Sequence, residues 1–351
     1  YALRRRPGRP DGTNSDWTTS FWPGQLWLAA QVTGDAAYRA EALAHVASYT
    51  ERLDREVDLE THDLGFLFSL SCVNAARLAG SAEGRLAALR AADHLMVRFL
   101  PVAGIIQAWG RLDDPELRGR TIVDSLMNTP LLYWATETTG DPRYAEAATV
   151  HAGHVRDQIV REDGTTFHTF YWDAETGVPL RGATAQGSGD DTCWARGQAW
   201  AIYGFALVHR HTDDATMLDA SRRCADRFLE MLPEDMVPAW DLALGTDPTL
   251  LRDTSAAAIT ASGLLELADA LERTGDRLDA AARYRAAAVA MLESLAAHYA
   301  LVPGSQPAPL LREAVYDLPR GVGVDEGNLW GDYYYLEALA RLHAPDLVSA
   351  W

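Results

Sequence analysis

Six short segments bring together side chains that can do chemistry, and each directly precedes an apolar stretch with helical periodicity. Every segment contains an aspartate and three contain a tryptophan, over residues 16–18, 61–63, 122–124, 191–196, 253–255 and 329–332. His62 and Arg196 lie in two of the same segments. Carboxylates and imidazoles are the usual groups of general acid–base catalysis, and an indole at a polar rim can stack on a sugar ring. The pattern predicts one polar, aromatic site if the six segments meet in space.

Aspartate before a helix also has a purely structural explanation. It is a preferred N-cap residue, a role that stabilises a helix by about 1 kcal/mol. We expect this role for Asp253 and Asp332, but capping does not explain why tryptophan and histidine gather at the same positions. Trp27, Trp134 and Trp240 lie in other contexts, and we expect them in the hydrophobic core.

Five times along the chain, an apolar helical pattern runs into a short turn and then into a second helical pattern. The turns lie at residues 33–35, 80–81, 139–141, 212–214 and 274–276. Glycine in such a turn ends the first helix in a left-handed conformation, and Asp or Thr caps the next one. Each unit therefore predicts a pair of antiparallel helices.

The two helices of each pair differ in composition. The second helices, at 38–53, 86–100 and 281–295, are rich in alanine and carry Arg and Glu on one face, which is typical of a half-exposed helix. The first helices are apolar on every side, at 22–32, 66–78, 126–135, 198–208 and 259–271, and a sixth such pattern spans 333–342. Helices that are apolar all round are buried all round.

These patterns predict an all-α fold in which six inner helices are ringed by six outer ones, an (α/α)6 barrel. We expect a single domain over residues 1–351, with the first outer helix before Tyr1. If the inner helices run parallel, their six N-termini open at one end of the barrel. Strands are not expected, because no run alternates polar and apolar residues between turns.

Composition excludes several classes of partner. The formal net charge is −18 and lysine is absent, so a basic stripe for nucleic acid or an anionic membrane is not expected. No apolar run approaches the roughly 20 residues of a membrane-spanning helix. Three cysteines without a C-x-x-C motif argue against disulfides and thiolate zinc sites, which favours a reducing, cytoplasmic location.

Cofactor motifs are also absent from the sequence, which contains no Walker loop, H-E-x-x-H or G-x-S-x-G. His151 and His154 have the spacing of metal ligands but fall on an outer helix without a thiolate or carboxylate partner. His209 and His211 end a helix, where cations interact well with its dipole. We therefore expect no metal and no organic cofactor. The remaining equipment, paired carboxylates among aromatic side chains, suits acid–base chemistry on sugars.

Several sequence blocks resemble the unsaturated glucuronyl hydrolases, which form glycoside hydrolase family 88. The blocks are residues 61–66 (THDLGF), 104–110 (GIIQAWG), 122–128 (IVDSLMN), 168–173 (HTFYWD), 194–200 (WARGQAW) and 330–335 (WGDYYY). These blocks are spread along the sequence, so the resemblance covers nearly the whole chain. The resemblance implies an (α/α)6 barrel that removes a 4,5-unsaturated uronic acid from the non-reducing end of small oligosaccharides by hydrating the C4=C5 double bond.

The resemblance also implies roles for individual residues. Asp124 is expected to protonate C4 and then activate water, and Asp63 to hold substrate hydroxyls and stabilise the charged intermediate. Burial and the charge of Asp63 should raise the pKa of Asp124. Further contacts to the sugar are expected from the cations His62, His168 and Arg196, the indoles Trp17, Trp109, Trp194 and Trp200, and also Gln186 and Tyr316. Ala185 departs from relatives that place a histidine there, which leaves the neighbouring sugar open.

Three other functions are compatible with the residues. An unsaturated rhamnogalacturonyl hydrolase would share the barrel and the hydration chemistry, but the blocks around Asp63 and Arg196 favour the glucuronyl type. A sugar epimerase on the same barrel would use paired histidines, which His62 and His168 could supply. A non-catalytic sugar-binding barrel leaves the paired acids unexplained.

Overall fold

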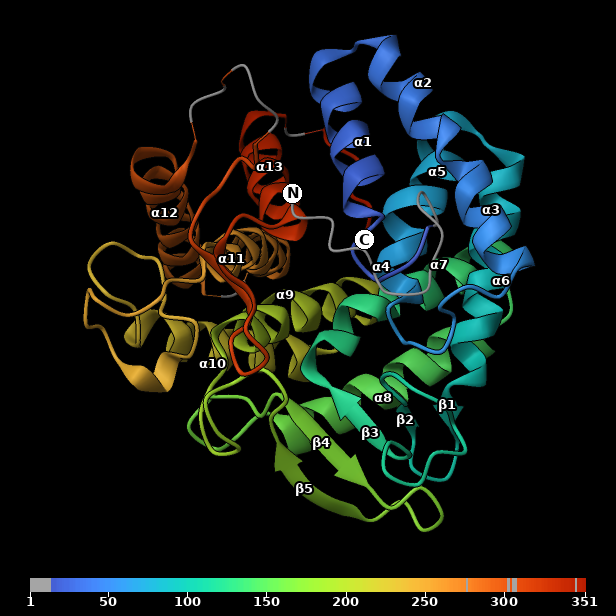
Figure 1. Cartoon of the computed structure of the whole chain (residues 1–351), viewed down its shortest axis with the longest axis horizontal. Coiled ribbons are helices and arrows are strands. Elements are labelled where there is room, and N and C mark those ends of the chain that lie inside the picture. The colour runs from blue at the N-terminus through green and yellow to red at the C-terminus, as the bar shows by residue number, and fades with distance from the viewer. Residues whose placement is uncertain (1–13, 276, 302–303, 305–307, 345) are drawn as a thin grey trace.

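The structure is a computed structural model that describes residues 14–275, 277–301, 304, 308–344 and 346–351. It is mostly helical, as the sequence predicts (Figure 1). The inner helices are α1 (Phe21–Thr33), α4 (Leu64–Phe68), α5 (Asn74–Ala79), α7 (Thr129–Thr139), α9 (Ala195–Thr212), α11 (Thr254–Thr274) and α13 (Leu329–His343). A π-helical turn, η1 (Ser69–Val73), joins α4 to α5, and a 3-10 turn, η2 (Val123–Asn128), leads into α7.

Most of the outer helices directly follow an inner helix and pack against it. They are α2 (Ala36–Ala44), α3 (Val46–Asp54), α6 (Ala82–Val97), α8 (Arg143–Ile159), α10 (Ala215–Glu230) and α12 (Leu278–Ser294). A further π-helical turn, η4 (Leu295–Tyr299), extends α12. The single outer helix expected at 38–53 is divided at His45 into α2 and α3. The outer helix expected before Tyr1 lies outside the described residues.

The inner helices form a closed cycle of neighbours. Helix α1 packs against α13, α13 against α11, α11 against α9, α9 against η2 and α7, α7 against α4, and η1 against α1. Figure 1 shows them following one another around the molecule. Their burial on every side follows from their composition, because each apolar face that is removed from water stabilises the folded state.

The turns between paired helices use the predicted residues. Gly34 ends α1 in a left-handed conformation (φ 70°), and its N–H donates to the carbonyl of Ala30. Asp35 then caps α2 by accepting the backbone N–H of Ala37. The same sequence of a left-handed residue followed by an N-cap recurs between α9 and α10. There Asp213 adopts the left-handed conformation and Asp214 is the N-cap.

The prediction that strands are absent is wrong, because the described residues form three small antiparallel sheets in the connections between helices. They pair β1 (Phe99–Leu100) with β2 (Ile105–Ile106), β3 (Arg120–Ile122) with β4 (Thr169–Trp172) and β5 (Pro179–Ala183), and β6 (Ala314–Asp317) with β7 (Val322–Glu326). Strands of two to five residues are too short to show an alternating pattern in the sequence. Strand β3 ends where η2 begins, so this sheet helps to place the residues of that turn.

An aromatic cluster fills the centre of the helical ring. Trp351 is buried there against Phe66 and Tyr334, and its indole N–H donates to a carboxylate oxygen of Glu337 (2.7 Å). The ring of Phe66 in turn lies 5.3 Å from that of Trp200. The expectation that Trp27, Trp134 and Trp240 belong to the core is confirmed, since all three are at most 8% exposed.

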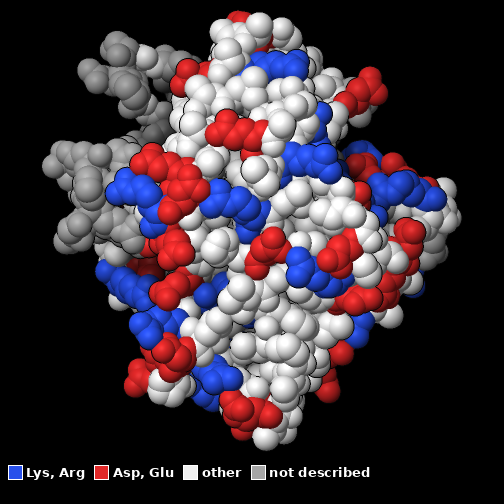
Figure 2. Space-filling model, turned by 90° about the vertical axis from the view of Figure 1, so that its right-hand side faces the viewer, with Lys and Arg blue, Asp and Glu red and all other residues white. Residues whose placement is uncertain are grey.

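The outer surface carries charges of both signs. Figure 2 shows acidic and basic side chains interspersed over one face of the molecule. In the part of the chain that the structure describes, no helix is both long and apolar enough to cross a membrane.

Candidate active site

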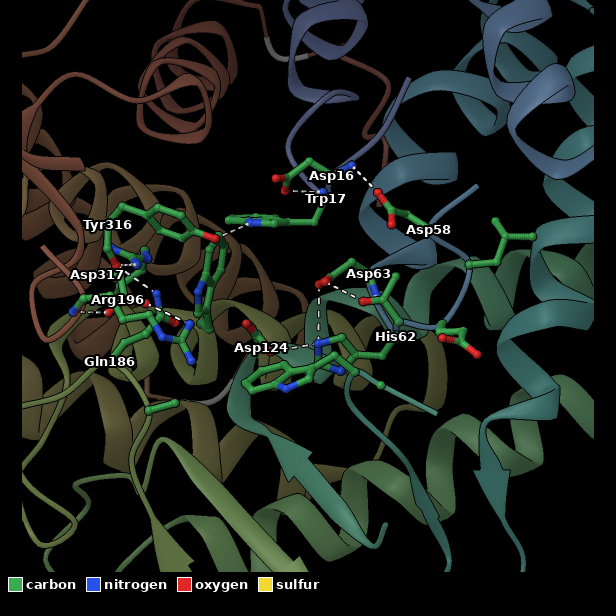
Figure 3. A pocket seen from close by; sticks show the side chains of 18 of the residues that line it. Asp16, Trp17, Asp58, His62, Asp63, Asp124, Gln186, Arg196, Tyr316 and Asp317 are labelled. Carbon is green, nitrogen blue, oxygen red and sulfur yellow. Dashed lines mark hydrogen bonds and ion pairs between the residues drawn. The ribbon is translucent and has the colours of Figure 1, made fainter. Parts of the chain in front are cut away.

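The N-terminal ends of α1, α4, η2 and α9 surround a pocket with a volume of about 600 Å³ (Figure 3). Ten of the eleven site residues predicted from the sequence line this pocket, namely Trp17, His62, Asp63, Trp109, Asp124, Gln186, Trp194, Arg196, Trp200 and Tyr316. The pocket therefore lies where the parallel inner helices were expected to open.

One imidazole connects the two candidate catalytic carboxylates. The Nε2 atom of His62 lies 3.4 Å from Oδ1 of Asp63 and 3.3 Å from Oδ1 of Asp124. Figure 3 marks both interactions and shows the three side chains converging in the pocket. The second oxygen of Asp63 accepts a hydrogen bond from the hydroxyl of Thr61 (2.7 Å). Asp63 is thus held by two donors, whereas Oδ1 of Asp124 has no hydrogen-bond partner among the described residues.

The electrostatic environment separates the two acids. Burial raises the pKa of Asp63, but His62 and the Thr61 hydroxyl outweigh it, so this pKa lies below its ordinary value. Burial raises the pKa of Asp124 to about 7, and the charge of Asp63 acts in the same direction against the opposing charges of His62 and Arg196. The expected direction for Asp124 is therefore confirmed. Near neutral pH, Asp63 is a carboxylate and Asp124 is partly protonated.

The pKa of His62 is displaced as well. Burial lowers it, but the negative charges of Asp63 and Asp124 have the larger effect and raise it above its ordinary value. The raised pKa favours the protonated, positively charged form of His62 between the two acids. A positive charge at this position stabilises Asp63 in its ionised form and limits how far the pKa of Asp124 can rise.

A backbone contact between two elements brings the acids together. A Cβ atom at Gly65 would lie 2.3 Å from the Cα of Asn128, so α4 and the end of η2 can approach this closely only with glycine at this position. The side-chain oxygen of Asn128 also accepts the backbone N–H of Phe66 (2.7 Å). Asp63 at the start of α4 and Asp124 in η2 are the carboxylates that this contact places side by side.

Aromatic side chains form the walls of the pocket. The indole N–H of Trp17 donates to the hydroxyl of Tyr316 (3.1 Å), so these two rings are held together at one side. Trp109 stacks on the guanidinium of Arg120, which lies 4.1 Å from the ring centre. Trp194 and Trp200 also line the pocket, although both are almost fully buried.

Arg196 is the cation at the base of this wall. It is 1% exposed and forms a buried ion pair with Asp253 (2.8 Å). Its remaining hydrogen bonds go to the carbonyls of Val315 and Tyr316, and its guanidinium lies 4.4 Å from the ring centre of Trp194. These contacts fix the guanidinium, which lowers the entropic cost of binding an anion beside it.

His168 does not line the pocket, and the expectation that it is a cation is wrong. Its Nδ1 accepts the backbone N–H groups of Ala185 (3.0 Å) and Gln186 (3.2 Å), so that nitrogen carries no proton. Burial and the nearby charge of Arg196 lower the pKa of His168 to about 3. Its neutral ring packs against Trp194, with centroids 4.3 Å apart, and supports the loop that presents Gln186.

Of the other aspartates that precede inner helices, Asp16 lines the pocket, Asp191 is exposed, and Asp253 and Asp332 have structural roles. Asp253 caps α11 through the backbone N–H of Ser255, as expected. The capping role predicted for Asp332 is wrong, because Asn328 caps α13 and Asp332 instead accepts the N–H groups of Leu310 and Leu311. A sequence pattern cannot distinguish a cap from a nearby carboxylate that binds a distant loop.

Eleven lining residues were not among the predicted site residues: Asp16, Arg52, Glu56, Asp58, Leu59, Glu60, Thr61, Gly110, Ala185, Asp317 and Arg320. Arg52 is an example of a lining residue that stabilises the wall of the pocket. It is buried on α3 and donates to the carbonyls of Asp16, Val57 and Asp58, which connects two loops of the pocket wall. The charged run that directly precedes Thr61 is the sequence signal that could have indicated this wall.

No group of three or more His, Cys, Asp or Glu side chains among the described residues is arranged to hold a metal ion. The site is therefore defined by Asp63, Asp124 and His62, with Arg196 and the aromatic walls around them.

Comparison with known proteins agrees with this geometry. The profile of Glycosyl Hydrolase Family 88 matches residues 7–265. The unsaturated glucuronyl hydrolase of Bacillus sp. (strain GL1) is 46% identical over 329 residues, which are 94% of this chain and 86% of that protein. The unsaturated chondroitin disaccharide hydrolase of Streptococcus pyogenes serotype M1 is 44% identical over 333 residues, with 94% and 82% covered.

Solved structures give the same result. The crystal structure of the Bacillus sp. GL1 unsaturated glucuronyl hydrolase has a TM-score of 0.92 and covers 95% of this chain and 88% of its own. An unsaturated glucuronyl hydrolase variant from Streptococcus agalactiae, complexed with dGlcA-GalNAc6S, has a TM-score of 0.83 at 39% identity, with 96% and 83% covered. The matched profile and these relatives span both candidate catalytic aspartates. The chain therefore belongs to glycosyl hydrolase family 88 and is a glycosidase.

Proposed function

We propose that this glycosidase removes a 4,5-unsaturated glucuronic or related uronic acid from the non-reducing end of di- or oligosaccharides. The closed cycle of inner helices with its outer layer supports an (α/α)6 barrel, and we propose that residues 1–351 belong to one such domain. The three cysteines are free, buried thiols, which supports a reducing compartment such as the cytoplasm.

The proposed reaction is the addition of water to the C4=C5 bond. Asp124 in its acid form donates a proton to C4, and the positive charge that develops is shared by C5 and the ring oxygen. The resulting Asp124 carboxylate then takes a proton from a water molecule as the water oxygen bonds to C5. The product is a hemiketal, which opens and releases the remaining sugar from C1.

The observation that carries this proposal is the difference in protonation between Asp124 and Asp63. Protonation of an enol-ether carbon near neutral pH needs an acid whose pKa is close to that pH, and burial gives Asp124 a pKa of about 7. Asp63 stays ionised beside it, which suits a group that stabilises a cation. This differs from common glycosidase chemistry, in which two carboxylates act at the anomeric carbon.

The other lining residues are assigned to substrate binding. We assign the uronate carboxylate to the side of the pocket with Arg196 and Gln186, where a fixed guanidinium can offset its charge. Trp17, Trp109, Trp194 and Trp200 present aromatic surface to the sugar rings, with Tyr316 held against Trp17. His168 contributes through the loop that it supports.

The geometry gives no support to a sugar epimerase. That chemistry needs two histidines that exchange protons with the substrate, but His168 is buried outside the pocket lining with its Nδ1 committed to backbone donors. His62 is placed between two carboxylates instead. The names of the relatives favour a glucuronyl over a rhamnogalacturonyl substrate.

The test is the ultraviolet absorbance of the conjugated double bond. Unsaturated disaccharides from hyaluronan, chondroitin, heparin and rhamnogalacturonan are incubated with wild type, Asp124→Asn and Asp191→Asn. Asp191 is an exposed acid that precedes α9 outside the pocket, so it is the matched control. Loss of absorbance with wild type and Asp191→Asn, and a rate at least about 100-fold lower with Asp124→Asn, is the expected result. Unchanged absorbance with every substrate contradicts the proposal.

A further inference from the structure

A buried histidine behind the pocket connects the elements that carry the candidate catalytic residues. His151 lies on the outer helix α8 and is fully buried. Its Nδ1 accepts the backbone N–H of Ile106 (3.0 Å), so the ring proton lies on Nε2, which donates to the hydroxyl of Ser125 (2.7 Å). Burial lowers the pKa of His151 to about 3, and the imidazole therefore acts as a neutral bridge with one donor and one acceptor.

One end of this bridge holds the turn that carries Asp124. Ser125 directly follows Asp124 in η2, and its side chain is buried. The backbone of a 3-10 turn is held by few hydrogen bonds of its own, so an external partner has a large influence on its position. A shift of this turn would move the Asp124 carboxyl relative to His62, from which it is now 3.3 Å away.

The other end holds the segment that places His62 and Trp109. Ile106 ends β2, and the chain continues to Ala108, whose carbonyl accepts the backbone N–H of His62 (2.9 Å). Trp109 pairs with Thr61 in an isolated antiparallel bridge. The two hydrogen bonds of one imidazole thus fix the spacing between the Asp124 turn and the His62 segment.

We propose that His151 is a positioning residue for the reaction, which holds Asp124 at its working distance from His62 through Ser125 and Ile106. This inference rests on the proposed function of Asp124. His151 itself does not line the pocket, so it touches neither the substrate nor the reacting atoms. Its effect on the reaction passes through the positions of Asp124 and of the His62 segment, and through the burial of Asp124.

Three substitutions separate the two hydrogen bonds. His151→Gln places an amide N–H near the position of Nε2 and can keep the bond to Ser125. His151→Asn places a carbonyl near the position of Nδ1 and can keep the bond to Ile106 alone. His151→Phe fills the space and removes both bonds. The matched control is His154→Gln, on the same helix three residues later, whose side chain does not line the pocket.

Three readouts are measured for each variant: kcat and KM on an unsaturated disaccharide, the pH midpoint of the Asp124 carboxyl by carbon NMR without substrate, and the thermal unfolding midpoint. We expect His151→Phe to lower kcat by about 10- to 100-fold with KM changed less than about twofold, because a small displacement of a reacting group has a large effect on rate. The Asp124 midpoint should fall by about half a unit or more, since a displaced turn admits water to a carboxyl now kept acidic by burial.

His151→Gln should keep kcat within about threefold of wild type, His151→Asn should resemble His151→Phe, and His154→Gln should match wild type. The proposal is overturned if His151→Phe is folded with wild-type kcat and an unchanged Asp124 midpoint. If His151→Phe does not fold, equal kcat values for the Gln and Asn variants overturn it. A wild type that turns over no unsaturated disaccharide refutes the proposed function, whereas a shifted Asp124 midpoint in the variants would still support the positioning role.

Discussion

Asp63 and Asp124 both approach the same imidazole nitrogen within 3.4 Å, yet their surroundings move their pKa values in opposite directions. Burial raises the pKa of both acids, but at Asp63 it is outweighed by the charge of His62 and by the hydrogen bonds from His62 and Thr61. At Asp124, burial and the charge of Asp63 outweigh the charges of His62 and Arg196, and Oδ1 has no hydrogen-bond partner among the described residues. When the environment separates the pKa values of two neighbouring acids, the acid with the higher pKa is the one that can donate a proton near neutral pH. The other acid remains ionised.

The pH dependence of turnover should report this assignment. Because the active form has Asp124 protonated and its pKa is about 7, kcat/KM should fall about tenfold per unit above that value. Asp63, with its lowered pKa, remains ionised through the weakly acidic range, so the profile should be flat there. Initial rates at low substrate concentration measure this profile, and activity that rises steadily from about pH 6 to about pH 9 would contradict the role of Asp124.

Removal of the positive charge of His62 should move the alkaline limb of the pH profile of kcat/KM. His62 lowers the pKa of Asp124, so His62→Gln should raise it and shift the alkaline limb of kcat/KM upward by about one unit, although kcat itself falls. His209→Gln is the control, since that histidine is buried at the far end of α9 against the carbonyl of Asp214. A limb that moves to lower pH would show that His62 does not act on Asp124 through its charge.

The raised pKa also predicts a cost in stability. A carboxyl whose pKa is raised by folding favours the native state while it is protonated, and that contribution is lost as pH rises from its unfolded value near 4 through about 7. Asp124→Asn cannot ionise, so at about pH 8 it should be more stable than wild type by about 2–4 kcal/mol, and nearly equal at about pH 4. Denaturant unfolding at the two pH values measures the difference, and equal stability at both would refute the raised pKa.

At the scale of elements, the site depends on how closely two backbones approach. Helix α4 meets the end of η2 at Gly65 and Asn128, and the hydrogen bond from the Phe66 N–H to the Asn128 side chain fixes their register. Neither residue lines the pocket, so their contribution is to bring the starts of two inner helices within reach of one histidine.

A methyl group at this contact should therefore separate the acids. Gly65→Ala places a Cβ 2.3 Å from the Cα of Asn128, and we expect a loss of about 2–3 kcal/mol in unfolding free energy and at least about tenfold in kcat. Gly153→Ala on α8 is the matched control, because its Cβ meets nothing within 4 Å and alanine favours a helix by about 0.5–1 kcal/mol. Both variants are compared by chemical unfolding and by turnover; equal stability of the two would contradict the close approach.

Sequence patterns predicted the inner and outer helices because apolar periodicity is a local signal, as in α9 and α11. The π-helical turn at Ser69–Val73 and the short strands were not predicted, since they arise from contacts with distant segments. The same reason applies to single residues. His151 has the spacing of a metal ligand in the sequence, but only the fold shows that it faces Ser125 and Ile106.

At the scale of the whole molecule, a protein with a net charge of −18 is proposed to bind an anionic sugar. Acidic side chains also outnumber basic ones among the residues that line the pocket, which include Glu56, Asp58 and Glu60. The long-range field therefore opposes the substrate, and local cations such as Arg196 must compensate at short range.

This balance predicts a salt dependence. Between about 10 mM and about 150 mM ionic strength, the Debye length falls from about 30 Å to about 8 Å, which screens the distant repulsion more than the contacts within the pocket. We expect KM for an unsaturated disaccharide to fall by about two- to fivefold over this range while kcat stays constant. Steady-state kinetics in sodium chloride measure the effect, and a KM that rises with salt would show that the local cations dominate the field.

The central aromatic cluster has an optical consequence. The ring of Trp17 lies 5.1 Å from that of Trp330 and 5.6 Å from that of Phe66, which reaches on to Trp200 and Trp351. Indoles at such separations exchange excitation energy before they emit light. A sugar that stacks on Trp17 would therefore alter the fluorescence of the whole cluster, so ligand binding to a slow variant could be followed through emission alone, without any chromophore in the sugar.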